Sequence, residues 1–133
     1  KTYLAVLAGP PPQQKGTLWH YLTKDTKTHI AHVSGQPTKN AKKAGLEYTV
    51  LDSRGALYLV RVRLLTGRFH QIRAQFASAG ASVYGDMKYG ARNVKAPLAL
   101  FASEVSLLHP TTDAVMRFSA LPDFHPFTLF HIE

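Results

Sequence analysis

Residues 46–80, LEYTVLDSRGALYLVRVRLLTGRFHQIRAQFASAG, contain the pattern that decides the fold. Two runs rich in β-branched, aromatic and other apolar residues, 46–51 and 56–65, are separated by Asp-Ser-Arg-Gly at 52–55. This separator has turn chemistry and ends in glycine, which tolerates a positive φ. The pattern predicts a β-hairpin.

The second run alternates and then gives way to a helical pattern. Apolar residues at even positions share one face of a strand, while the other face becomes basic at Arg61 and Arg63. After a Thr-Gly-Arg turn, apolar residues recur at helical spacing from Phe69 to Ala79, and Gly80 suits a left-handed cap. The expected order is therefore strand, glycine turn, helix.

Outward from this stretch, strand patterns outnumber helical ones. Short alternating runs predict strands at the N-terminus, at 29–33, at 98–108 and around 115–118, while 34–44 has the composition of a polar turn. The apolar residues of 16–25 indicate a short helical or irregular segment at one edge of the core. Strands in irregular order, without an internal repeat, predict an α+β fold with a mixed, largely antiparallel sheet and a few flanking helices.

Length and cysteine content narrow the class of protein. The chain has 133 residues, 45% of them hydrophobic, which matches one globular domain. It has no cysteine, which excludes disulfide frameworks, thiolate zinc sites and thiol nucleophiles. Such a composition is compatible with a reducing compartment, and we expect a cytoplasmic protein.

The charge points to anionic partners. Sixteen Lys and Arg against eight Asp and Glu give a formal net charge of +8. RNA, DNA and anionic membrane surfaces are the usual partners of such an excess. No stretch of 18 apolar residues and no basic amphipathic helix with a large aromatic face occurs, so we expect no membrane partner.

The start of the predicted helix concentrates polar chemistry. Free backbone N–H groups and the helix dipole make this end attractive to anions, and Arg68 adds a guanidinium able to grip a phosphate or carboxylate. His70 and Arg73 are three residues apart, so they share a helix face. Spacing alone leaves a second interpretation open, in which both arginines are solvated surface charges and His70 is structural.

Other candidate motifs are weaker. The glycine-containing loop 85–90 lacks a Walker-type sequence, which favours a tight structural loop with packed tyrosines. His29 and His32 would point to opposite faces of a strand, so we predict no metal site. The eight acidic residues form no catalytic pair by spacing, and no serine nucleophile elbow is present.

Taken together, several motifs resemble the C-terminal part of the RluA family of pseudouridine synthases. The resemblance runs from Tyr3 to about Pro126. Its motifs are Lys1-x-Tyr3-x-Ala5, Leu22-x-Lys24-Asp25, Thr66-Gly67-Arg68-x-His70-Gln71-Ile72-Arg73, Gly85-Asp86-x-Lys88-Tyr89-Gly90 and His109-Pro110.

The resemblance implies isomerisation of uridine to pseudouridine in structured RNA, either rRNA or tRNA, without cofactor or metal. The family's catalytic aspartate lies in a His-Arg-Leu-Asp segment, which this chain lacks. We therefore expect residues 1–133 to be the C-terminal portion of a single catalytic domain. An upstream segment of the same protein would complete the site, and the chain alone would be inactive.

The resemblance also implies residue roles. Tyr3 matches the tyrosine that lies against the target base and handles its C5 proton. Arg73 matches the arginine that pairs with the catalytic aspartate. The remaining predicted RNA-binding residues are Arg68, His70, Gln71, Arg61, Arg63 and Lys88.

Two alternatives stay open at this point. The first is a non-catalytic basic RNA-binding module, in which the lysines and arginines hold phosphates. The second is a structural or interaction domain whose positive charge only keeps it in solution.

Overall fold

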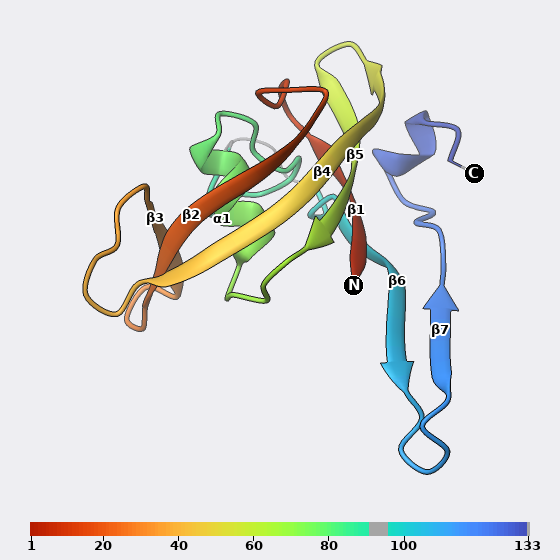
Figure 1. Ribbon diagram of the computed structural model, residues 1–133. Helices are drawn as coiled ribbons and strands as arrows, with labels where there is room; N and C mark the ends of the chain where they lie inside the picture. The colour runs from red at the N-terminus through yellow and green to blue at the C-terminus, as the bar shows by residue number, and fades with distance from the viewer. Residues whose placement is uncertain (91–95, 133) are drawn as a thin grey trace.

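The computed structural model describes residues 1–90 and 96–132, and in these residues a single α-helix packs on a seven-stranded sheet (Figure 1). The elements in chain order are β1 (Thr2–Leu7), β2 (Lys15–Asp25), β3 (Ile30–Ser34), β4 (Lys42–Arg54), β5 (Leu57–Leu64), α1 (Gln71–Ser78), β6 (Leu100–Leu108), β7 (Val115–Ser119) and the 3₁₀ helix η1 (Phe127–Leu129). None of the helices in these residues is long and apolar enough to cross a membrane.

The sheet has the order β3-β2-β4-β5-β1-β6-β7, which places the first strand between β5 and β6. All neighbouring strands in the described ranges pair antiparallel. The prediction of a largely antiparallel α+β sheet is therefore confirmed. A mixed sheet with a few flanking helices is not observed, since one α-helix and one short 3₁₀ helix make up the helical content of the described residues.

Strand β2 corrects the expectation for residues 16–25. The segment is neither helical nor irregular but forms most of an 11-residue strand. It pairs with β4 from Lys15 opposite Thr49 to Leu22 opposite Lys42, and with β3 on its other side. Pairing on both edges satisfies the backbone hydrogen bonds of β2, so tertiary context outweighs the weak local pattern.

The hairpin prediction is confirmed, with longer strands than expected. Strand β4 begins at Lys42, inside the predicted polar turn 34–44, and both arms extend toward Gly55. Gly55 has φ 58°, the left-handed conformation that its place in the turn requires. A register shift between Val50 and Asp52 marks a bulge close to the turn.

The helix prediction is confirmed, but α1 begins at Gln71 rather than at Phe69. His70 has φ 52°, and this left-handed residue delays the start of the helix by two residues relative to the apolar spacing. Gly80, with φ 83°, follows the helix end as predicted. The buried Gln75 donates from Nε2 to the carbonyl oxygens of Leu18 and Ala44, which joins α1 to β2 and β4.

The sheet has two distinct faces. Residues opposite each other in antiparallel strands share a face, so Tyr3, Val62 and Tyr48 lie on the same side. The ring of Tyr48 meets Phe76 of α1 with centroids 5.4 Å apart, which identifies this side as the helix face. Arg61, one residue out of phase with Val62, lies on the opposite face.

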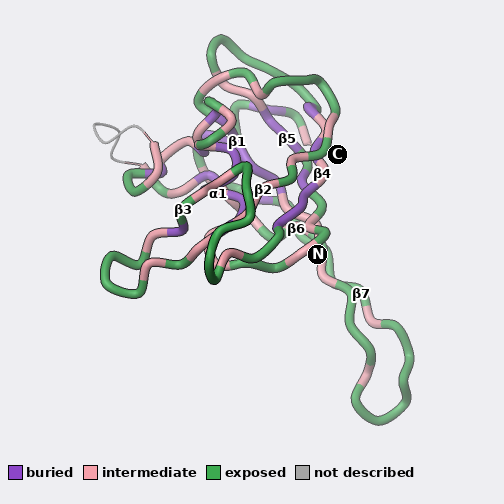
Figure 2. The backbone as a smooth tube through the Cα atoms, turned by 60° about the vertical axis from the view of Figure 1, so that its left-hand side comes forward, coloured by how far each residue is buried: buried purple, intermediate pink, exposed green. Residues whose placement is uncertain are grey.

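The core lies on both faces of the central strands, with α1 packed on one face and the segment around Phe127 on the other, whereas the β6–β7 hairpin projects outward. Figure 2 shows buried backbone concentrated at β1, β4, β5 and α1, and an exposed hairpin tip. Only the first part of β6, Leu100 to Glu104, pairs with β1. The central strands of the sheet are therefore buried, whereas β7 and the outer part of β6 are mostly exposed.

Candidate functional site

A cavity of about 300 Å³ opens beside the start of α1, and we call it the α1 pocket. Its polar lining consists of Tyr3, Arg68, His70, Gln71 and Arg73. Leucines of β5, β6 and the segment before β6, together with an isoleucine of α1, supply its apolar wall. The structure thus brings five of the eight predicted site residues together, across β1, the 66–70 turn and α1.

Arg73 is held by a carboxylate that the sequence reasoning did not assign to the site. Its Nε donates to Oδ2 of Asp86 at 2.9 Å, and its Nη2 donates to Oδ1 at 3.0 Å. The side chain of Asp86 is 0% exposed and that of Arg73 is 19% exposed. A bidentate pair with this degree of burial fixes the plane of the guanidinium.

Asp86 is further fixed by backbone donors of its own loop. The N–H groups of Lys88 and Tyr89 both donate to Oδ1 at 3.1 Å. Burial alone raises the pKa of the Asp86 carboxyl, but the hydrogen bonds from Arg73 and from these N–H groups outweigh burial and hold the pKa below its usual range. Asp86 is therefore ionised at neutral pH.

Gly85 makes this placement of Asp86 possible. Its φ is 82°, and a Cβ at this position would overlap the backbone oxygen of Pro97. The prediction that 85–90 is a tight structural loop agrees with this geometry. What the sequence did not reveal is that the loop also carries the partner of Arg73.

His70 connects Arg73 to the same loop. Its Nε2 lies 3.3 Å from Nη1 of Arg73, and its Nδ1 lies 2.9 Å from the hydroxyl of Tyr89. Arginine can only donate, so Nε2 accepts and Nδ1 carries the proton that it donates to Tyr89. Burial, then the positive charges of Arg73 and Lys88, lower the pKa of His70, which favours this neutral form.

The guanidinium of Arg73 keeps two donors for a further ligand. Arginine has five N–H groups; Asp86 takes one on Nε and one on Nη2, and His70 takes one on Nη1. One N–H then remains on each terminal nitrogen, and the described residues supply no partner for either. Donors on both terminal nitrogens are thus available to a carboxylate or phosphate.

Gln71 borders the α1 pocket, but its polar atoms serve the fold. Its Oε1 accepts from the Thr66 hydroxyl at 2.8 Å and from the N–H of Arg68 at 2.9 Å, while its Nε2 donates to the carbonyl of Gly45 at 2.9 Å. The buried amide thus ties the glycine turn to β4. Gln71 shapes the pocket wall without presenting a free polar group.

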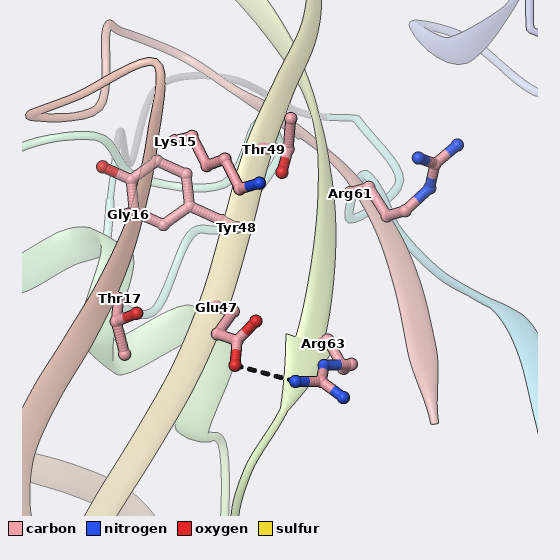
Figure 3. Close-up of a pocket in the computed structure, with 8 residues that line it drawn as sticks. All are labelled: Lys15, Gly16, Thr17, Glu47, Tyr48, Thr49, Arg61 and Arg63. Atoms are coloured by element: carbon pink, nitrogen blue, oxygen red, sulfur yellow. Dashed lines mark hydrogen bonds and ion pairs between the residues drawn. The ribbon is translucent and has the colours of Figure 1, made fainter.

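Three predicted RNA-binding residues lie away from the α1 pocket. Arg61 and Arg63 line a separate cavity of about 240 Å³ on the opposite face, and Figure 3 shows Arg63 directed to Glu47, 2.8 Å away. Lys88 donates from Nζ to the carbonyl of His29 at 3.1 Å, beside β3. Sequence alternation indicated the basic face of β5 correctly but not the side on which the pocket lies.

Within the described ranges, no group of three or more His, Asp or Glu side chains is close enough together to hold a metal ion. His32 instead lies 3.7 Å from Asp25 on the β2–β3 edge.

Comparison with known proteins identifies the family. A family model described as RNA pseudouridylate synthase matches residues 1–78, more than half of the chain. The chain belongs to this family. The resemblance to pseudouridine synthases derived from the motifs is therefore confirmed.

Two curated bacterial relatives illustrate the similarity in sequence. An uncharacterized RNA pseudouridine synthase of Mycoplasma pneumoniae is 32% identical over 124 residues, covering 91% of this chain and 40% of the relative. The ribosomal large subunit pseudouridine synthase C of Rickettsia bellii is 36% identical over 91 residues, covering 68% of this chain and 30% of the relative. The chain thus spans well under half of the length of these relatives.

Solved structures of human family members share the fold. The human RNA pseudouridylate synthase domain containing 1 superposes with a TM-score of 0.76 at 26% identity, covering 92% of this chain and 54% of that chain. Human RNA pseudouridylate synthase domain containing 4, at 22% identity, has a TM-score of 0.74 and covers 97% of this chain and 60% of that chain. The latter likeness concerns the fold alone.

Proposed function

We propose that this chain forms part of an RNA pseudouridine synthase that isomerises a uridine in rRNA or tRNA. In this reaction the N1–C1′ bond breaks, C5 of the turned uracil bonds to C1′, the C5 proton leaves and N1 gains one. The observation that carries the proposal is the α1 pocket, where Tyr3 and Arg73 line one cavity in a chain of this family.

Arg73 has the geometry to hold a catalytic carboxylate. Asp86 and His70 occupy three of its N–H groups and leave one N–H free on each terminal nitrogen. We propose that these two N–H groups bind an aspartate from an upstream segment of the same protein. Two hydrogen bonds from the guanidinium favour the ionised form of such an aspartate. The family resemblance implies that this aspartate is the essential catalytic group.

Tyr3 has the chemistry to handle the base. It lies on the helix face of β1, half-buried, and shares the α1 pocket with apolar side chains. Its ring offers a stacking surface for uracil, and its phenolic oxygen can exchange a proton with C5. A cytoplasmic location and the identity of the RNA stay predictions.

The test is pseudouridine formation on RNA carrying tritiated uridine, by the full-length protein and by this chain alone. We expect turnover only with the full-length protein. Arg73→Lys in the full-length protein should lower kcat at least about 10²-fold, the scale of losing a preorganised electrostatic partner, with little change in RNA affinity. Arg68→Ala should mainly weaken RNA binding.

Lysine is chosen at position 73 because Arg73→Ala would leave Asp86 buried without a positively charged partner. Folding of each variant is checked by circular dichroism. Equal effects of the Arg68 and Arg73 variants on binding and turnover would contradict these roles. RNA binding by a full-length protein that forms no pseudouridine would instead support the non-catalytic RNA-binding module.

A further inference from the structure

A third cavity, of about 360 Å³, lies between β2, β3, β4 and the 66–70 turn, and we call it the lysine pocket. Its charged lining is Lys24, Lys42 and Arg68, and Thr23 and Asn40 add polar groups. No aspartate or glutamate lines it. By contrast, the cavity on the opposite face contains Glu47, which already neutralises Arg63.

The three cations of the lysine pocket have no carboxylate partner in the described residues. The ion pairs among the described residues join His32 to Asp25, Arg63 to Glu47 and Arg73 to Asp86, and none of them involves Lys24, Lys42 or Arg68. Asp25 is the nearest acid along β2, but its Oδ1 accepts the backbone N–H groups of residues 27 and 28. Positive charge gathered around a cavity without an acid favours an anionic ligand.

Arg68 lines both the lysine pocket and the α1 pocket. Its Nε donates to the carbonyl of Lys43 at 3.0 Å, which anchors the guanidinium. Its two terminal nitrogens have no partner among the described residues. The side chain therefore stands at the boundary between the cavities with donors available to a ligand that extends across both.

Sheet geometry places the two pockets on the same side. Lys42 pairs with Leu22 in the β2–β4 register, and alternation along β4 puts Lys42 on the side of Tyr48, the helix face. Lys24 lies on this side too, since its Nζ is 4.4 Å from the ring centroid of Phe69. A strand of RNA on the helix face can thus reach both pockets.

The lysine pocket suits phosphates better than bases. Its aromatic residue, Phe69, stacks on the His70 ring with centroids 3.8 Å apart, and the Lys24 ammonium lies over the Phe69 ring as well. These two contacts occupy the faces of the ring that a base would need for stacking. What stays available is ammonium and guanidinium groups, which bind the backbone independently of sequence.

We propose that Lys24, Lys42 and Arg68 bind backbone phosphates of the RNA strand adjacent to the nucleotide held in the α1 pocket. This inference rests on the proposed function. It assigns the lysines of β2 and β4 on the helix face, rather than Arg61 and Arg63, to the path of the substrate strand.

The experiment measures binding of single-stranded oligouridine to the full-length protein by fluorescence anisotropy over a series of salt concentrations. The variant is Lys24→Gln with Lys42→Gln. The matched control is Lys15→Gln with Lys43→Gln, which removes two lysines from the same two strands but on the opposite face. All four side chains are exposed, so the variants should fold.

We expect the slope of log K against log salt to become shallower by about 1.4 in the lysine-pocket variant, at about 0.7 for each lost phosphate contact, and to stay unchanged in the control. Equal slope changes in the two variants, or none in the first, would overturn the proposal. So would binding by the unsubstituted protein that does not depend on salt.

Pseudouridine formation by the same variants separates this proposal from the proposed function. We expect a higher KM and an unchanged kcat for the lysine-pocket variant. A protein that forms no pseudouridine, yet shows the expected slope change, would retain the phosphate site and contradict the catalytic role. If the lysine-pocket variant forms pseudouridine with an unchanged KM, the catalytic role is supported and the phosphate site is contradicted.

Discussion

At the scale of single residues, Asp86 organises the candidate site. It is the one charged residue that is buried within residues 1–90 and 96–132, and it binds Arg73 and two backbone N–H groups at once. A buried carboxylate with four donors leaves little freedom to its partner. The position of the Arg73 guanidinium is thus determined by this chain.

Asp86→Asn should destabilise the chain strongly. The substitution keeps the shape of the side chain but removes the charge that compensates the largely buried Arg73, and breaking such a pair costs about 3 kcal/mol. The free energy of unfolding is measured by urea denaturation. Asp123→Asn, at an exposed position, serves as the control and should change this free energy by less than about 0.5 kcal/mol. Similar effects of the two substitutions would contradict the structural importance of the pair.

The pKa of His70 should lie below the ordinary value for histidine, which is about 6.5. Burial and the charges of Arg73 and Lys88 disfavour its protonated form in the folded chain. The unfolded chain therefore binds the proton more readily, so this contribution to stability is full above about pH 6.5 and is lost as the pH falls toward the lowered pKa.

The measurement for His70 is a pH titration of its ring followed by NMR. Lys88→Gln should raise the pKa of His70, because it removes one of the positive charges that lower it. Lys15→Gln, on the far face of the sheet, should leave the pKa of His70 unchanged. A pKa above 6.5 in the unsubstituted chain would show that the described hydrogen-bond pattern is wrong.

At the scale of elements, the 85–90 loop should be the least tolerant turn of the site. Gly85→Ala combines left-handed strain of about 1–2 kcal/mol with overlap against the backbone of Pro97, at about 1–3 kcal/mol. Gly55→Ala carries only the strain, since its Cβ would meet no atom within 4 Å. Thermal unfolding followed by circular dichroism should therefore show the larger loss for Gly85→Ala, and an equal loss would contradict the close approach.

The hairpin and α1 were predictable because periods of two and 3.6 hold over most of their residues, despite the bulge between Val50 and Asp52. Strand β2 was not, since Trp19 and Tyr21 put aromatic rings on the opposite face while His20 stands on the helix face. Its apolar residues therefore show no clean alternation. Only the pairing with β3 and β4 reveals the strand.

In the candidate site, too, only contacts between residues close in sequence were predictable. His70 and Arg73 are three residues apart, and their contact follows from helix geometry. The pairing of Arg73 with Asp86 spans 13 residues and depends on the positive φ of Gly85, which no periodic pattern encodes. The Gly-Asp-x-Lys-Tyr-Gly motif was visible, but the direction in which its aspartate points was not.

At the scale of the whole molecule, the register of the sheet separates two groups of cations. Alternation along β5 showed that Arg61 and Arg63 share a face, but not which face receives α1. The pairing of Tyr3 with Val62 and of Leu4 with Arg61 decides it, since these pairs put Tyr3 and Arg61 on different sides. The RNA-binding residues predicted from the basic face of β5 therefore included Arg61 and Arg63, which the folded sheet places away from the α1 pocket.

The central place of β1 governs how this part of the protein can fold during synthesis. Its pairing partners lie at 58–63 in β5 and at 100–104 in β6. At about 5–20 residues per second, the ribosome needs about 5–20 s to complete the second partner after β1 has been made. Until then β1 can pair only with β5, so the edge of β1 that β6 covers in the folded sheet stays open to unintended strand pairing.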